Sequence, residues 1–284
     1  MEDRALWEER AFIHALGGYT IEVAGAHLVT HERIPVPRFN FVQDVSVAAE
    51  RQSAFFERML DHYFQRALRP SVRVRRPVPA FLDRGLRAFA FRTEPAAHTL
   101  LAKVAENPTV SPAPLPTREV REAELSELDA VLGLWTHARE RDEFRRSVEV
   151  AWQRPNPGET LRPVVAVEQG RPVGACLVHV YRDLVGVYAV TTAPESRGRG
   201  VATDLVRWAV GDSLRAERPV VLHTDDPRLA LHLAPDGFTP LLEFQVYALP
   251  EDAELALPPP GPLGPPRWRP PRRSGGGSAP ASGP

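Results

Sequence analysis

The sequence predicts an α/β fold built on a mixed β-sheet, and two segments carry this prediction. Residues 162–192 contain three extended apolar runs separated by short turns, a pattern typical of an antiparallel meander. A helical pattern over 199–217 and an extended run at 220–223 follow directly and indicate a strand–helix–strand unit. A meander that passes into such a unit combines antiparallel with parallel pairing, so the sheet should be mixed.

Turn residues and apolar spacing define the individual elements. Gln169-Gly170 predicts a tight turn between the first two strands, and Arg182-Asp183 occupies the position of the second turn. Upstream, residues 120–135 begin as a short strand and continue as a helix, with apolar residues at Leu125, Leu128, Val131, Leu132 and Trp135. In the helix at 199–217, the inward face should be Val201, Leu205, Val206, Ala209 and Val210. The outward face should be Asp204, Arg207, Gly211 and Arg215.

The chain divides at a proline-rich stretch. Residues 107–116 carry prolines too closely spaced for a helix or a central strand, and they are predicted to be a linker. Residues 251–284 are rich in Pro, Gly and Arg and have too few apolar side chains to offset the entropy of ordering. They are predicted to be a disordered tail. Two folded domains, 1–106 and 117–250, remain.

These two domains resemble each other in the order of their elements. In the first, Arg69-Pro70 precedes an alternating run, and a helical stretch then ends at Gly85. In the second, Arg218-Pro219 precedes a similar run, and a helical stretch then ends at Gly237-Phe238. The shared order predicts a duplicated fold.

Composition narrows the possible partners and the location. A formal net charge of -1 over 284 residues gives no field that would attract nucleic acid or an anionic membrane, so neither is expected as a partner. The single cysteine, Cys176, allows no internal disulfide and no thiolate metal cluster. The charged N-terminus does not resemble a signal peptide, and no apolar run reaches the roughly 18 residues of a membrane span. We therefore expect a soluble, cytoplasmic protein.

Residues 187–206, VYAVTTAPESRGRGVATDLV, carry the strongest functional signal. The extended run breaks at Pro194, and a helix begins after the sequence Arg-Gly-Arg-Gly at 197–200. Glycines at a helix start let a ligand approach the backbone, and the first-turn amides there have no intrahelical acceptors. With the helix dipole these amides form an anion site suited to a pyrophosphate, and two arginines add positive charge at its rim.

The glycine pair does not match the common nucleotide-binding motifs. The segment has no Gly-Lys-Ser/Thr of a P-loop and no G-x-G-x-x-G with a distal acid of a dinucleotide fold. A glycine pair before a helix is also compatible with a plain turn. The apolar strand before it and the strand–helix–Gly-Phe segment after it favour a ligand-binding loop.

The order of these elements resembles the acyl-CoA-binding core of the GCN5-related N-acetyltransferases (GNAT). The family signature Arg/Gln-x-x-Gly-x-Gly/Ala is met by Arg197, Gly200 and Ala202. The resemblance covers about residues 117–250 and is most specific over 185–238. It implies a GNAT fold, in tandem with a degenerate N-terminal half, and acetyl-CoA as co-substrate with no metal.

The resemblance also implies the roles of individual residues. Backbone groups of Val190 and Thr192 would hold the pantetheine and polarise the thioester carbonyl, and amides from Gly198 to Thr203 would bind the pyrophosphate. The candidate cofactor-binding residues are Val190, Thr191, Thr192, Arg197, Gly198, Arg199, Gly200, Val201, Ala202 and Thr203. No glycine occurs between Gly25 and Gly85, where the first domain would need its own loop. Residues 1–106 are therefore interpreted as a degenerate, non-catalytic repeat; an independent substrate-binding domain is the alternative.

The catalytic residues depart from the family pattern. The family commonly has Asn-Pro before its last helix and a tyrosine four residues before the Gly-Phe, whereas this chain has Asp226-Pro227 and Leu233. Two residues are candidates for the acid that protonates the leaving thiolate. His232 is the neighbour of Leu233 on the helix, with a surface histidine as the alternative interpretation. Tyr188 lies in the strand beside the thioester, with core packing as its alternative.

The sequence indicates the general base and the acceptor site less specifically. His179 and Asp183 are candidates for a base acting through water, although Asp183 also suits a turn and His179 a strand face. Asp225 and Asp226 are placed to attract a cationic amine, and an aspartate before Pro227 is equally a helix cap. Cys176 is expected to be a buried apolar side chain and not a nucleophile.

The sequence thus predicts an acyl-CoA-dependent N-acetyltransferase that transfers the acyl group directly to the amine of a small molecule or a protein. An acyl-CoA-binding pseudoenzyme or regulatory sensor without turnover is the alternative, and Leu233 is the residue that favours it. Fold alone does not identify the acceptor. The oligomeric state is left open, and a monomer of two packed GNAT-like halves is one arrangement the sequence allows.

Overall fold

The computed structural model describes residues 1–104, 118–127, 129–130, 138–215 and 218–250. The predicted linker at 107–116 and the predicted tail at 251–284 lie outside the described residues. So does the last part of the helix predicted over 120–135. Among the helices in the described ranges, none combines the length and apolar character that crossing a membrane requires.

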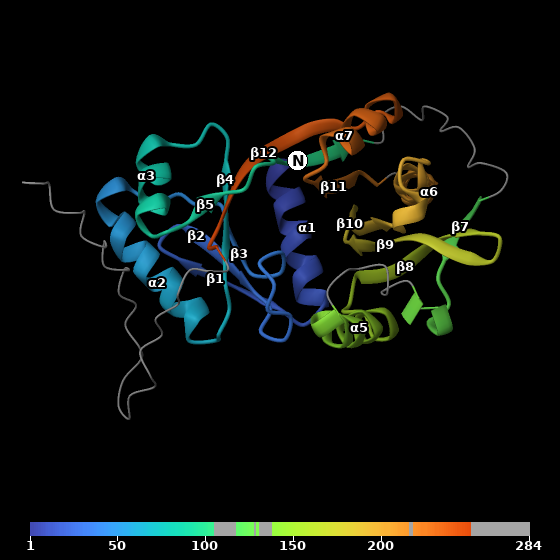
Figure 1. The fold of residues 1–284 in the computed structure, drawn as a ribbon, viewed down its shortest axis with the longest axis horizontal. Helices are drawn as coiled ribbons and strands as arrows, with labels where there is room; N and C mark the ends of the chain where they lie inside the picture. The colour runs from blue at the N-terminus through green and yellow to red at the C-terminus, as the bar shows by residue number, and fades with distance from the viewer. Residues whose placement is uncertain (105–117, 128, 131–137, 216–217, 251–284) are drawn as a thin grey trace, which may run out of the picture.

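The described strands join into one mixed sheet that runs through the whole protein (Figure 1). The strands of the first half are β1 (Tyr19–Val23), β2 (Ala26–Thr30), β3 (Phe41–Gln43), β4 (Ser71–Arg75), β5 (Arg92–Thr93) and β6 (His98–Lys103). Those of the second half are β7 (Arg118–Glu122), β8 (Glu159–Glu168), β9 (Arg171–Tyr181), β10 (Leu184–Thr192), β11 (Val220–Thr224) and β12 (Thr239–Ala248). Their order across the sheet is β1-β2-β3-β4-β12-β6-β11-β10-β9-β8-β7, with β5 paired to β12.

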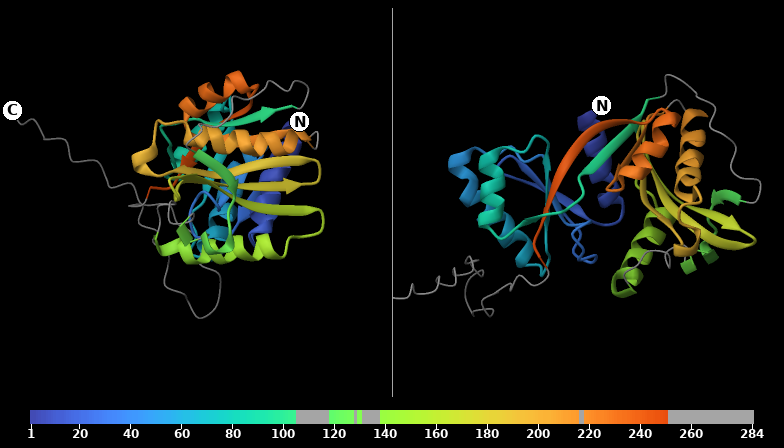
Figure 2. Two further views of the ribbon diagram at one scale, coloured as in Figure 1. Left: turned by 90° about the vertical axis from the view of Figure 1, so that its right-hand side faces the viewer. Right: turned by 45° about the horizontal axis from the view of Figure 1, so that its top comes forward.

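Each half contributes its last long strand to the other half. β6 is antiparallel to β11 of the second half, and β12 is antiparallel to β4 of the first half. The two exchanged strands also pair with each other, and the right-hand view of Figure 2 shows them crossing between the halves. This exchange makes the sheet continuous. The two ends of the sheet are related by approximate two-fold symmetry in strand order.

Helices cover both faces of the sheet. They are α1 (Glu2–Ala15), α2 (Gln52–Phe64), α3 (Ala80–Ala88), α5 (Ala138–Gln153), α6 (Val201–Arg215) and α7 (Pro227–Leu233). In β9, Val178 joins the apolar core under α6, whereas the adjacent Leu177 joins the core that contains Phe12 of α1 and Phe144 of α5. Because successive strand residues face opposite sides, α6 and α1 lie on opposite faces of the second half (Figure 1). α2 and α3 pack on the first half through a separate core.

In the second half, the local sequence predictions that the described residues test are confirmed with two exceptions. In the first half, the helix predicted to end at Gly85 instead continues to Ala88 as α3. The three meander strands form as β8, β9 and β10, and positive φ angles at Gln169 and Gly170 make the predicted tight turn. The inward face predicted for α6 is buried throughout. Asp204, predicted to face solvent, is instead buried at 9% exposure because Arg118 pairs with it. The helix α5 is the second exception, since no helix was predicted from the sequence at 138–153.

Candidate functional site

In the second half, the parallel strands β10 and β11 stop pairing before they end, and we call this place the strand opening. Pairing of β10 with β11 ends at Val187 and Leu222, although both strands continue. Close to this point the register of β10 against β9 shifts between Tyr188 and Thr191, and Ala189 adopts a left-handed φ of 51°. A shift of this kind is a β-bulge, which re-aims the backbone groups of the bulged strand. Past Val187 and Leu222 the two strands no longer pair with each other, and the bulge of β10 lies beyond this point.

A glycine loop joins the end of β10 to α6. Gly198 and Gly200 have φ angles of 75° and 79°, conformations that disfavour a side chain. A Cβ added at either glycine would meet no atom within 4 Å, so both positions face open space. The first amide of the helix with a backbone acceptor is that of Asp204, which donates to Gly200 O at 3.0 Å. Within the described part of the chain, the amides from Gly198 to Thr203 have no hydrogen-bond acceptor.

Arg118 of β7 anchors this loop from below. Its guanidinium side chain is fully buried and forms ion pairs with Asp204, in the first turn of α6, and with Glu168 at 2.7 Å. It also donates to the carbonyl oxygen of Arg199 at 3.0 Å. One cation therefore ties the loop, the start of α6 and the end of β8 together and holds the loop in position.

The two loop arginines differ in their surroundings. Arg199 forms an ion pair with Glu168 at 2.9 Å, so part of its charge is already compensated. Arg197 is exposed and has no ion pair with any described residue. The uncompensated charge at the rim of the loop comes mainly from Arg197.

On the opposite face of the sheet, α1 places a carboxylate over Gly186 of β10, next to the last residues that pair with β11. Glu8 is 0% exposed; its Oε2 accepts a hydrogen bond from the hydroxyl of Tyr188, and its Oε1 shares a hydrogen bond with Nδ1 of His179 at 2.8 Å. Tyr188 also stacks on Phe12, with ring centroids 3.9 Å apart. Burial raises the pKa of Glu8, and the hydrogen bond and charge of His179 offset this only in part. Tyr188 is the first β10 residue beyond the last β10–β11 pair, so this cluster adjoins the opening.

The next residue of α1, Glu9, binds both halves of the protein. Its carboxylate pairs with Arg73 of β4 and with Nδ1 of His223 of β11 at 2.8 Å. Burial raises the pKa of Glu9, but the charges of Arg73 and His223 and their hydrogen bonds outweigh it and bring the pKa to about 2. Burial lowers the pKa of His223, and Glu9 offsets this in part. Glu9 is therefore a structural residue that is charged at neutral pH.

The other predicted catalytic residues lie apart from this cluster. His232 is exposed on α7 and has no hydrogen bond or ion pair with a described residue, whereas Leu233 is buried in the core under α6. Asp183 lies in the β9–β10 turn and pairs with Arg4 of α1 at 2.6 Å. Asp226 caps α7 by accepting from the amide of Arg228. Cys176 is fully buried, and burial raises its pKa to about 12.

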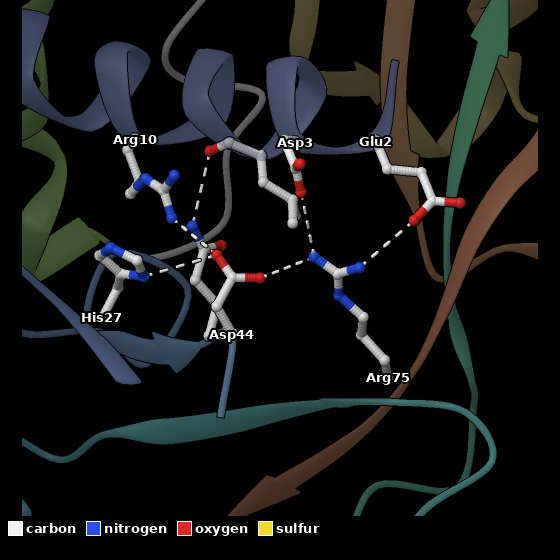
Figure 3. Close-up of polar contacts among 8 residues, drawn as sticks. Glu2, Asp3, Arg10, His27, Asp44 and Arg75 are labelled. Atoms are coloured by element: carbon white, nitrogen blue, oxygen red, sulfur yellow. Dashed lines mark hydrogen bonds and ion pairs between the residues drawn. The ribbon is translucent and has the colours of Figure 1, made fainter. Parts of the chain in front are cut away.

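At the corresponding place, the first half carries a network of ion pairs and hydrogen bonds between charged side chains (Figure 3). β3 and β4 are parallel and paired up to Val42 and Val72, and Asp44 follows with a left-handed φ of 55°, as Ala189 does in the second half. The Asp44 carboxylate accepts hydrogen bonds from Arg10 at 2.8 Å and Arg75 at 2.9 Å. A residue whose carboxylate is held by two guanidinium groups therefore stands where the second half has Ala189.

The first half also lacks the glycine loop. Seven residues without a glycine, 45–51, connect Asp44 to α2. In the second half, eleven residues, 190–200, connect Ala189 to α6. The first half is thus a structural repeat without an anion-binding loop.

Two residues of the site, Glu8 and Arg118, were not found by sequence reasoning. Both are charged residues in segments that look like ordinary polar surface, and both are buried because segments distant in the sequence cover them. For Arg118 the available signal was its place at the start of the extended run 118–122. For Glu8 it was the apolar spacing of Leu6, Phe12 and Ile13, which indicates a buried helix face near it.

Comparison with known proteins agrees with this geometry. Residues 123–234 match the acetyltransferase (GNAT) family. A GCN5-related N-acetyltransferase from Kribbella flavida has a TM-score of 0.61 at 14% identity, over 85% of this chain and 94% of that one. A functionally unknown conserved protein from Staphylococcus epidermidis has a TM-score of 0.64 at 12% identity, over 82% of this chain and 94% of that one.

A tandem GNAT protein from the clavulanic acid biosynthesis pathway has a TM-score of 0.56 at 16% identity, over 78% of this chain and 77% of that one. At these identities the likeness concerns the fold. No curated protein sequence matches the chain. Residues 123–234 therefore form a domain of the acetyltransferase (GNAT) family, within a chain that has the tandem GNAT fold.

Proposed function

We propose that this chain is an N-acyltransferase that uses acetyl-CoA as co-substrate and transfers the acetyl group directly to an amine. The observation that carries the proposal is the glycine loop at the start of α6. Its amides from Gly198 to Thr203 have no acceptor among the described residues, and Gly198 and Gly200 face open space. A pyrophosphate fits such a loop because nothing prevents its oxygens from reaching the backbone.

The loop and β10 would bind different parts of acetyl-CoA. The amides from Gly198 to Thr203 and the dipole of α6 bind the pyrophosphate, and Arg197 adds mobile charge. Backbone groups of Val190, Thr191 and Thr192 hold the pantetheine arm between the strand ends. Val190 lies in the bulge and has no register partner among the described strands, so its N–H is suited to polarise the thioester carbonyl. Bound acetyl-CoA supplies the activated acyl group.

Tyr188 is the residue we propose as the acid that protonates the leaving thiolate. Burial and the charges of Glu8 and Glu9 raise the pKa of Tyr188 well above its ordinary value, so the phenol keeps its proton at neutral pH. Tyr188 is the first residue of β10 beyond its pairing with β11, and we place the leaving sulfur near it. His232 has no described contact that would orient it, and for this reason Tyr188 is preferred. The proton transfer contributes a factor on the order of 10²–10⁴.

We propose further that residues 1–106 do not bind CoA and instead wall the acceptor side of the site. α1 lies over the face of β10 opposite α6, which is the side from which an acceptor would reach a thioester held by the loop. Cytoplasmic location and an acceptor amine on a small molecule or a protein remain part of the proposal.

Two measurements on the full chain test this function. Isothermal titration with CoA should give one site per chain, because only the second half has the loop. Mixing the protein with acetyl-CoA and a panel of primary amines should release free CoA thiol only when an acceptor amine is present. Binding without release from any amine would support a pseudoenzyme, and two equivalent sites would contradict the role given to residues 1–106.

A further inference from the structure

We infer that Glu8 of the N-terminal helix is a positioning residue for acyl transfer, which orients the hydroxyl of Tyr188 and returns a proton to it through a Glu8–His179 pair. The inference rests on the proposed function, since Tyr188 acts as the acid there. It gives residues 1–106, the repeat that lacks the glycine loop, a direct part in the chemistry of the second half.

The hydrogen bonds of Glu8 have the arrangement of a proton relay. One carboxylate oxygen accepts from Tyr188 and the other is bonded to Nδ1 of His179, so a single carboxyl group connects the two side chains. Nε2 of His179 is buried and has no hydrogen-bond partner in the described part of the chain. A buried imidazole with one nitrogen held and one nitrogen open can take up a proton at the second while it gives one up at the first.

The strand is shaped to receive this carboxylate. A Cβ added at Gly186 of β10 would lie 2.3 Å and 2.4 Å from the two carboxylate oxygens of Glu8 and 2.4 Å from the ring of Tyr188. Any side chain at that position would expel the carboxylate from its place. Gly186 has an ordinary negative φ, so backbone conformation does not demand the glycine. The glycine at position 186 therefore leaves the space that the Glu8 carboxylate occupies.

Burial without a permanently charged partner is costly, and Glu8 forms no ion pair with an arginine or lysine among the described residues. The adjacent Glu9, by contrast, is paired with Arg73. A buried carboxyl held only by groups that can exchange protons is better suited to proton transfer than to stabilising the fold, because burial raises its pKa above the ordinary value.

Protons and electrons balance across the transfer. The acceptor nitrogen forms a bond to the acyl carbon, the carbon–sulfur bond breaks, and the sulfur takes its electron pair and the hydroxyl proton of Tyr188. Tyr188 recovers a proton from the Glu8–His179 pair. The acceptor ammonium loses two protons in becoming an amide; one refills the pair and the other leaves to water. No oxidant or further reactant is required.

The first test needs no turnover. The ¹³Cζ chemical shift of Tyr188 is followed as a function of pH in the free protein labelled with [¹³Cζ]tyrosine, and the signal is assigned with Tyr188→Phe. It should change with a midpoint pH above the ordinary glutamate pKa of 4.5. The labelled carboxyl of Glu8 should give the same midpoint. The Tyr188 shift should vanish in Glu8→Gln and persist in Glu9→Gln, which changes the neighbouring buried carboxyl. No such shift in the parent protein, or a shift that survives in Glu8→Gln, would overturn the inference.

The second test uses the amine-dependent release of CoA. Glu8→Gln keeps a hydrogen-bond acceptor for Tyr188 but cannot carry the proton, so kcat should fall at least tenfold with little change in KM. In a plot of kcat against pH, the fall of kcat at acid pH that the parent shows should be absent from Glu8→Gln. Tyr188→Phe should lower kcat similarly, and the double variant should add little, because the two residues act as a unit. An active parent with an unchanged profile in Glu8→Gln refutes the relay alone. An inactive parent refutes the proposed function and with it the role of Glu8 in acyl transfer, whereas the NMR titration separately tests whether Glu8 and Tyr188 titrate together.

Discussion

Glu8 and Glu9 are consecutive residues of α1, both buried, and their pKa values move in opposite directions. Glu8 faces groups that can lose or gain a proton, Tyr188 and His179, and burial raises its pKa. Glu9 faces the permanent charge of Arg73, which overcomes the effect of burial. One helix thus presents a proton-exchanging carboxyl to the second half and a fixed negative charge to the boundary between the halves.

Glu9→Gln should destabilise the protein at neutral pH. The pKa of Glu9 is about 2 when folded and near 4.5 when unfolded, so its stabilisation is full above 4.5 and is lost as pH falls toward 2. The shift corresponds to a loss on the order of 3 kcal/mol in the variant at pH 7. Urea unfolding of parent and variant at pH 7 and pH 3 measures this. An equal loss at both pH values would show that the charge of Glu9 is not responsible.

Glu8→Gln should show the opposite dependence on pH. Because the folded pKa of Glu8 is raised, the unfolded chain releases its proton first as pH rises, and the folded state is penalised increasingly above 4.5. The free energy of unfolding of the variant, relative to the parent, should therefore increase from pH 4 to pH 7. A relative stability that falls over this range would mean that Glu8 is stabilised as an ion.

Gly200→Glu should abolish CoA binding while the fold survives. The new side chain would point into the open space at the loop, where its charge meets the pyrophosphate. At an effective dielectric of about 20, a like charge at about 4 Å costs roughly 4 kcal/mol, or about three decades in affinity. Gly158→Glu is the matched control, since Gly158 has the same φ of 79° and also faces open space, but lies in the segment before β8. Calorimetry in which both variants bind equally would remove the loop from the site.

Arg118→Met should weaken both the fold and CoA binding. It leaves the carboxylates of Asp204 and Glu168 without their buried partner, and breaking a buried pair typically costs about 3–5 kcal/mol. The loop also loses the donor to Arg199 O. Arg121→Met is the control, because the pair of Arg121 with Glu127 is partly exposed and should be worth less than about 1 kcal/mol. Equal melting temperatures for the two variants would contradict the anchoring role of Arg118.

Cys176 should not react in the native protein. It is 0% exposed, and burial raises its pKa to about 12, so at pH 8 the thiolate is both scarce and inaccessible. A thiol reagent such as 5,5′-dithiobis(2-nitrobenzoate) should label one group per chain in denaturant and none without it. Native labelling at the rate of a free thiol would place Cys176 at the surface.

What the sequence could predict was local. The burial of Val201, Leu205 and Val206 follows from helical spacing, and the turn at Gln169-Gly170 from residues that tolerate positive φ, so both were predicted correctly. Asp204 was misassigned because its burial depends on Arg118, 86 positions away.

The remaining features are not local. Glu8 meets His179 across 171 positions, and nothing in either segment indicates the pairing. The helix α5 was missed although Phe144, Val148 and Ala151 have helical spacing and are buried. The dominance of charged residues in that stretch hid the pattern.

The exchange of β6 and β12 also constrains how the chain is made. During synthesis, β4 is complete long before residues 239–248 leave the ribosome, so one edge of the nascent first sheet stays open until translation is nearly finished. An open edge of this kind can pair with another nascent chain. The last strand to be synthesised closes it, which makes completion of the second half a condition for protecting the first.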